Sequence, residues 1–216
     1  MSTEKKHVAY SSAEEKMNFI THLVGAALSV VGLAALIFFS VREHNLRMFV
    51  SFTVYGLSMI MLYISSTLYH SGFSPKVRHF FRIADHCSIY LLIAGTYTPV
   101  ALIGLGGKTG WLLTIIIWSI AFVGIIFKSM FVHKFNFIST VVYLLMSWLC
   151  IAFAKQMITQ LPGATLIWLL IGGFFYTTGI TFYLWHKLHH HHGIWHIFVL
   201  CGSICHFIGV LYLVDS

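Results

Sequence analysis

Charged residues are scarce in this sequence of 216 residues. Lys, Arg, Asp and Glu together make up 9% of it, only six residues are acidic, and 58% are hydrophobic. A soluble domain needs more charge than this to cover its surface. The composition therefore excludes a soluble globular protein for most of the length and indicates a membrane protein.

The signatures of several other classes are also missing. The alternating apolar and polar residues of an outer-membrane barrel strand are absent. The four cysteines form no C-x-x-C pair and lie in apolar segments, which is typical of small core residues rather than of a disulfide framework. The formal net charge is +7, but the basic residues are scattered in loops. We therefore expect anionic lipid headgroups, and no nucleic acid, as partners.

Seven apolar runs are present, most of them near the roughly 20 residues that cross a bilayer. We predict an all-α polytopic membrane protein, with residues 1–18 as a polar amino-terminal segment and residues 19–214 as a single seven-helix transmembrane domain. The first run is too long for the core of a signal peptide, so we expect a span rather than a cleaved leader. The predicted spans are residues 19–40, 48–69, 85–105 with a kink at Pro99, 111–127, 137–154, 165–185 and 192–214.

The distribution of basic residues predicts the orientation. Of the 13 Lys and Arg residues, nine lie in the amino-terminal segment or in loops on its side of the membrane. The remaining four lie on the other side: Arg42, Arg47, Lys108 and Lys155. The positive-inside rule then places the amino terminus in the cytoplasm and the carboxyl terminus outside. It also brings the end of the second span and the starts of the third and seventh to the cytoplasmic leaflet.

Two histidines at the start of the seventh span suggest a metal site. His192 and His196 are one helical turn apart, so their imidazoles share a face and can converge on one ion. The topology offers His70 and Asp85 as further groups at the same depth. His189 lies in the same run of four histidines, but it has no partner four residues on. Interfacial histidines and chance His-x-x-x-His pairs are the alternative interpretation.

An ionisable side chain inside the membrane is costly, about 2.5–3.5 kcal/mol for a central Asp on insertion scales, and is therefore usually paired or functional. Our hypothesis is a Zn²⁺ site with His70, His192 and His196 as ligands and a position left for water. Asp85 would orient or deprotonate that water. Ser66, one turn before His70, would stabilise an oxyanion. A packing serine bonded to its own backbone is the alternative for Ser66.

Four more polar residues are candidates for a second shell or a gate. Glu15, Asn18 and His22 form one stripe at the start of the first span, where the alternative is simple capping of a helix. His206 follows the His pair on the same helix but lies about 20 Å deeper than His192 by helix rise. It is therefore too far for the same ion, and is a polar bridge between helices, a cavity wall or part of a proton path.

Several motifs follow one another along the chain: EKMNFITH, Ser66-x-x-x-His70, Asp85 followed by AGTYTP, HGIWH and the trailing His206. In these motifs and their order, the chain resembles the hemolysin III-related proteins of bacteria, which belong with the progestin and adipoQ receptors, including the adiponectin receptors. The resemblance covers nearly the whole chain.

The resemblance implies a seven-helix fold with a cytoplasmic amino terminus and a zinc ion held near that face by the three histidines. A wider relationship to alkaline ceramidases suggests metal-dependent hydrolysis of a lipid amide. The bacterial branch takes its name from red-cell lysis, and members have been linked to membrane lipid homeostasis.

Four functions follow as hypotheses for a multi-pass protein of the bacterial plasma or inner membrane. The leading one is zinc-dependent hydrolysis of an amide or ester bond in a lipid-like substrate, serving membrane lipid homeostasis. The second is a sensor in which zinc only joins helices and cytoplasmic loops contact a protein partner. The third is a cytolysin, against which the lack of an amphipathic barrel-forming stretch argues. The fourth is a proton or ion carrier.

Overall fold

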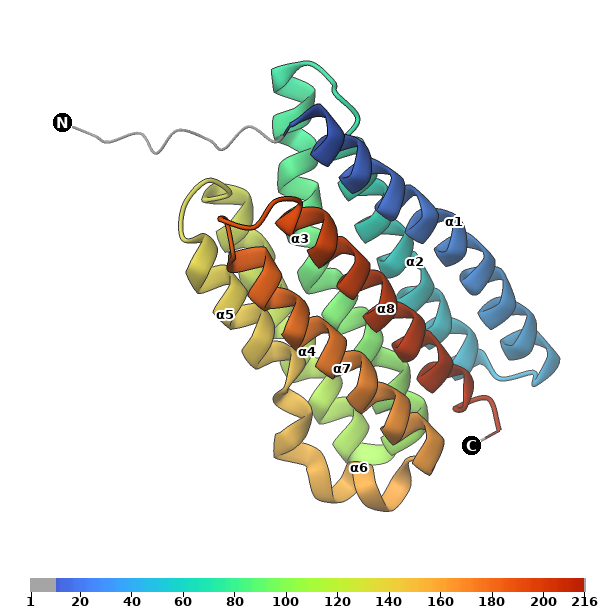
Figure 1. Cartoon of the computed structure of the whole chain (residues 1–216). Coiled ribbons are helices and arrows are strands. Elements are labelled where there is room, and N and C mark those ends of the chain that lie inside the picture. The colour runs from blue at the N-terminus through green and yellow to red at the C-terminus, as the bar shows by residue number, and fades with distance from the viewer. Residues whose placement is uncertain (1–10, 216) are drawn as a thin grey trace.

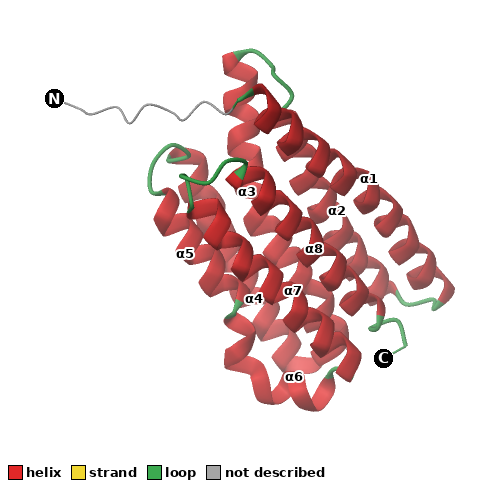
Figure 2. Cartoon of the chain, in the orientation of Figure 1, coloured by secondary structure: helices red, strands yellow, loops and turns green. Residues whose placement is uncertain are grey.

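A computed structural model describes residues 11–215, which form an all-helical bundle without strands (Figure 2). Seven helical segments in this range are long and apolar enough to cross a membrane, which confirms the predicted fold class. Residues 1–10 of the predicted amino-terminal segment, including Lys5 and Lys6, lie outside the described residues. The elements are α1 (Ser12–Arg42), α2 (Leu46–Tyr69), α3 (Pro75–Pro99), a π-helix (Val100–Leu105), α4 (Gly107–Met130), α5 (Asn136–Ser147), a 3₁₀ helix (Leu149–Phe153), α6 (Ala154–Gln160), α7 (Gly163–Leu184) and α8 (His191–Leu211).

The helices run alternately up and down, so that α8 packs against both α1 and α7 and closes the bundle (Figure 1). The start of α1, the turn between α2 and α3, the loop between α4 and α5 and the start of α8 all lie at one end of the bundle (Figure 1). We call it the site end. Its placement in the cytoplasm stays a prediction from the positive-inside rule.

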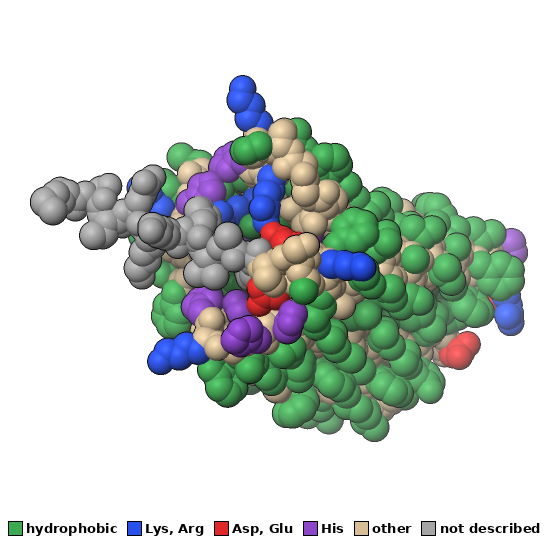
Figure 3. All heavy atoms as spheres, turned by 45° about the horizontal axis from the view of Figure 1, so that its top comes forward, with side chains coloured by type: hydrophobic (Ala, Val, Ile, Leu, Met, Phe, Trp, Pro, Cys, Tyr) green, Lys and Arg blue, Asp and Glu red, His purple; other side chains and the backbone are tan. Residues whose placement is uncertain are grey.

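The surface between the two ends is apolar, as a bilayer requires. Large hydrophobic side chains point outward, for example Val31, Phe122 and Leu145, whereas Phe52, Tyr55 and Ile117 are fully buried in the bundle. Charged and histidine side chains gather at the site end, above this apolar band (Figure 3). Within the bilayer the helices satisfy their own backbone groups, which leaves the side chains free to face lipid.

Helices α1 and α3 begin well before the spans that were predicted to start at residues 19 and 85. Helix α1 starts at Ser12 because Ser11 and Glu14 form a reciprocal capping box. Helix α3 starts at Pro75, where proline suits a first turn, and not at Asp85. The predicted loop that carries Arg78 is therefore helical, and Asp85 lies inside α3. A run of charged residues suggested a loop, but it forms the polar end of a helix that extends past the apolar band.

The third and fifth spans are not uniform α-helices. The α-helix of the third span ends at Pro99, the predicted position of a kink, and continues as a π-helix to Leu105. The fifth span changes to a 3₁₀ turn over Leu149–Phe153 before α6. The fourth span and the fifth are nevertheless both long enough to cross.

The contact of α4 with the π-helix requires a glycine. A methyl group at Gly110 would overlap the backbone carbonyl oxygen of Ala101, which has little freedom to move. We expect Gly110→Ala to destabilise the protein by about 1–3 kcal/mol, as overpacking does, and to lower the thermal unfolding midpoint measured in detergent. Gly163→Ala is the matched control, since its added methyl group would meet no other part of the described chain within 4 Å. Equal midpoints for the two variants would contradict this close approach.

Candidate metal centre

Three imidazoles meet at the site end of the bundle. His70 is the residue that ends α2, and His192 and His196 lie in the first two turns of α8. One ring nitrogen from each lies within 4.8 Å of the other two. His70 and His196 are only 4% and 2% exposed, and both ring nitrogens of His192 are shielded from solvent. The predicted convergence of two remote helix ends is thus present, in a geometry that can hold a metal ion.

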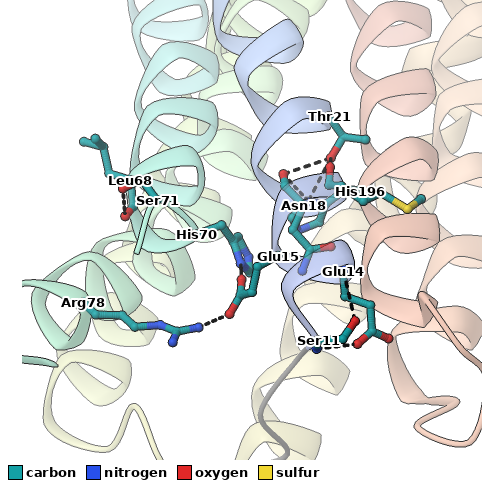
Figure 4. A network of polar contacts seen from close by, with 11 residues as sticks. Ser11, Glu14, Glu15, Asn18, Thr21, Leu68, His70, Ser71, Arg78 and His196 are labelled. Atoms are coloured by element: carbon teal, nitrogen blue, oxygen red, sulfur yellow. Dashed lines mark hydrogen bonds and ion pairs between the residues drawn. The ribbon is translucent and has the colours of Figure 1, made fainter. Parts of the chain in front are cut away.

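Glu15 of α1 orients the first imidazole. Its Oε2 accepts a hydrogen bond from Nδ1 of His70 at 2.6 Å, and its Oε1 accepts one from the guanidinium of Arg78 (Figure 4). A carboxylate of this kind can only accept, so the ring proton of His70 is on Nδ1. The lone pair of Nε2 is then available to a metal, as in the carboxylate and histidine pairs of zinc sites.

A backbone carbonyl orients His196 in the same way. Nδ1 of His196 lies 3.2 Å from the carbonyl oxygen of Asn18 and 3.2 Å from Oγ1 of Thr21 (Figure 4). The Thr21 hydroxyl donates to backbone carbonyls of its own helix, so it can accept but not donate here. Nδ1–H of His196 is therefore the donor, and Nε2 carries the lone pair that a metal would use.

His22 lies directly against the cluster. Its ring stacks on that of His196 with centroids 3.5 Å apart and an angle of 17°, and it meets the edge of Tyr63 at 5.1 Å. Both ring nitrogens of His22 are buried and have no hydrogen-bond partner among the described residues. The predicted stripe of Glu15, Asn18 and His22 thus faces the histidines along one side of α1, although Asn18 contacts them through its backbone.

Asp85 and Ser66 lie near the histidines but outside the cluster. Asp85 lines a cavity together with His192 and His196, and its Oδ2 is 3.6 Å from Nδ1 of His86. Ser66 is fully buried one turn before His70. Its hydroxyl has no hydrogen-bond partner among the described residues, so it is not bonded to its own backbone as the alternative interpretation required.

His206, the fourth residue predicted for a second shell or a gate, does not join the histidine cluster. Its Nε2 donates to the carbonyl oxygen of Leu169 at 3.1 Å, and its ring meets the edge of Tyr176 at 5.2 Å. This contact links α8 to α7, one of the roles considered from the sequence. His206 also lines the cavity, which places it on a wall remote from the metal ligands.

The cavity extends from the histidines into the bundle, with a volume of about 130 Å³. Its walls come mainly from α3, α5, α7 and α8, and most of them are apolar: Leu92, Ile93, Leu144, Ile180 and Val199. His22, Asp85, His192 and His196 line one part of it. Apolar walls with a few convergent polar groups are typical of a site for a small molecule or an acyl chain.

Arg78 was not predicted as a site residue, because its segment was predicted to be a loop. Only the early start of α3 brings its guanidinium onto Glu15. The early start of α3 could have been predicted from a proline that is followed by charged residues at helical spacing.

Removing the Glu15 carboxylate tests the orientation of His70. We expect Glu15→Ala to lower zinc affinity by about 10- to 100-fold, the usual effect of losing a partner of a ligating histidine. Glu15→Gln keeps an acceptor oxygen, so its zinc affinity should lie between that of Glu15→Ala and that of the unmodified protein. Affinity is measured by competition with a zinc chelator of known strength. Glu43→Ala, an exposed position at the other end of α1, is the control. Unchanged affinity in Glu15→Ala would mean that His70 needs no such partner.

The sequence is similar to known proteins of one family. A family model described as Haemolysin-III related matches residues 10–207. The chain is 49% identical to Hemolysin-3 of Bacillus cereus over 201 residues, which cover 93% of this chain and 92% of that protein. It is 46% identical to a Hemolysin-3 homolog of Bacillus subtilis (strain 168), covering 94% and 95%. It is also 27% identical to the human monocyte to macrophage differentiation factor over 165 residues, covering 73% and 67%.

Proposed function

Given that this chain is a multi-pass bacterial membrane protein and belongs to the hemolysin III-related family, we propose that it is a zinc-dependent hydrolase of a lipid amide or ester that acts in membrane lipid homeostasis. The observation that carries the proposal is the set of three imidazoles whose ring nitrogens lie within 4.8 Å of one another beside an apolar cavity. Catalytic zinc is commonly held by three protein ligands.

The donor set suits the ion. Imidazole is a good ligand for zinc, and the hydrogen bonds at Nδ1 of His70 and His196 leave Nε2 of both rings for coordination. His70, His192 and His196 would hold the ion. When bound, zinc supplies a water whose pKa is lowered toward about 7 and a positive charge that polarises a carbonyl group.

The other residues would act on the substrate and its proton. The Asp85 carboxylate, which lines the cavity beside His192 and His196, would take the proton of the attacking water. The Ser66 hydroxyl, buried without a protein partner among the described residues, would donate to the developing oxyanion. The apolar walls would hold the long chain of the substrate and exclude bulk water.

Metal content and turnover together test this function. Purified protein is analysed for zinc and then assayed in liposomes with fluorescent N-acyl sphingoid amides and with lipid esters. We expect one zinc ion per chain, hydrolysis that a chelator abolishes, and recovery of hydrolysis when zinc is returned. Protein that binds zinc but cleaves no amide or ester in such a panel would contradict the proposal.

A structural role for the metal is the second candidate, because the candidate centre joins four helices. His70 and the α8 pair come from two of them, and Glu15 and Arg78 add α1 and α3. A bound ion would then stabilise the site end, whose loops would contact a protein partner. Zinc that raises the unfolding temperature without any turnover would favour this function.

Lysis of red cells is the third candidate, and it comes from the printed name of the Bacillus cereus relative, Hemolysin-3. It predicts that protein freed of detergent and residual lipid releases haemoglobin from washed red cells. Lysis by a buffer matched in residual detergent would show that the protein is not the cause.

A further inference from the structure

A fully buried lysine lies on the cavity wall formed by α4 and α5. Lys128 occupies the last turn of α4, is 0% exposed, and lines the cavity that also contains Asp85 and the α8 histidines. Among residues 11–215, no other Lys or Arg lines this cavity. The end of α4 is at the site end of the bundle (Figure 1), so the ammonium group is inside the protein instead of reaching out to water or to lipid headgroups.

The described residues satisfy this ammonium group only in part. Nζ of Lys128 donates to Oδ1 of Asn136 at 2.9 Å, and no carboxylate of the described chain lies within 4.0 Å of it. Asp85, the acidic residue that lines the cavity, has its Oδ2 3.6 Å from Nδ1 of His86. An ammonium group has three N–H donors, and a buried charge is normally paired or fully hydrogen-bonded.

The neighbouring hydroxyl groups cannot take the place of the lysine as donors. On α5, Ser139 and Thr140 donate to the backbone carbonyls of Phe135 and Asn136. The Tyr143 hydroxyl donates to the carbonyl of His86. A ligand group at this wall therefore meets two donors, the Lys128 ammonium group and the side-chain NH2 of Asn136, whose Oδ1 already accepts from the lysine. The positive charge of the lysine favours negative charge on the ligand.

We propose that Lys128 and Asn136 form a binding site for the anionic group of a lipid, a carboxylate or a phosphate, whose acyl chain lies along the apolar part of the cavity. The fixed negative charge would complete the hydrogen bonds of the buried ammonium group. That this lipid is the substrate of the hydrolase rests on the proposed function. That the site binds an anionic lipid can be tested without measuring any turnover.

Binding of three amphiphiles with the same chain tests the site. Laurate, dodecyl phosphate and the neutral dodecanamide are titrated into purified full-length protein in a neutral detergent, with inorganic phosphate as the probe without a chain. We expect both anions to bind at least about tenfold more tightly than the amide, and Lys128→Gln to remove this preference, since one partner of a buried charge pair is lost. Comparison of laurate with dodecyl phosphate shows whether carboxylate or phosphate is preferred.

Controls separate this site from the metal centre and from folding defects. The titrations are repeated with a chelator present, because a metal ion at the histidines also attracts anions. Lys128→Arg keeps the charge and should keep the preference, and Lys134→Gln, on an exposed loop position, should not alter it. An unchanged preference for anions in Lys128→Gln, or none in the unmodified protein, overturns the inference. If Lys128→Gln loses the preference for anions but the unmodified protein hydrolyses no lipid, the binding site is supported and only the proposed function is contradicted.

Discussion

Asp85→Asn is expected to keep one zinc ion per chain and to reduce lipid hydrolysis by about 10²- to 10⁴-fold, the usual contribution of a general base. The metal should stay because Asp85 is not one of the three residues whose ligand atoms converge. Turnover should fall because the amide that replaces the carboxylate cannot accept the proton of the attacking water. The measurement pairs zinc analysis with initial rates on the best amide or ester substrate.

Each possible outcome for Asp85→Asn assigns the residue a role. Full turnover in a zinc-loaded variant would remove Asp85 as the base. Loss of zinc would make Asp85 a ligand, as in a closed structural site, and would favour the second candidate function. Asp215→Asn is the control: it changes an exposed carboxylate next to the carboxyl terminus. It should leave both the zinc content and the rate of hydrolysis unchanged.

The fold was predictable because membrane spans depend on local composition. Each span is a continuous apolar run, and its length decides whether it can cross. The meeting of His70 with His192 and His196 followed from the same count, since only a correct number of spans brings both helix ends to one side. The use of these histidines as ligands, with Asp85 and Ser66 as catalytic groups, stays a prediction that the variants test.

Contacts between helices were not predictable in this way. The hydrogen bond of His196 to the Asn18 carbonyl and the stacking of His22 on His196 depend on the rotation of α1 against α8. No local pattern fixes that rotation, because the outer face of each helix is as apolar as its inner face. Lys128 illustrates the same limit. It was predicted to lie in the loop after the fourth span, whereas it lies in the last turn of α4 and the rotation of that helix turns it into the cavity.

The second large effect is expected from the run of four histidines that spans the start of α8. His192→Ala should reduce bound zinc from one ion per chain to almost none at micromolar concentration. The loss of affinity should exceed the roughly 10- to 100-fold that an orienting partner contributes, because a ligand itself is removed. His189→Ala is the matched control, since His189 is an exposed neighbour in the same run and is not among the three converging residues. Zinc per chain is measured after equilibration with a weak chelator.

The same pair of variants also tests the register of the metal site. His192 and His196 share a helix face because α8 begins at His191, and the left-handed backbone of His190 separates the earlier histidines from that face. Zinc retained in His192→Ala but lost in His189→Ala would mean that the chain before α8 folds back over the site. If both variants kept zinc, the metal would lie elsewhere, and the three imidazoles would serve only to pack α2 against α8.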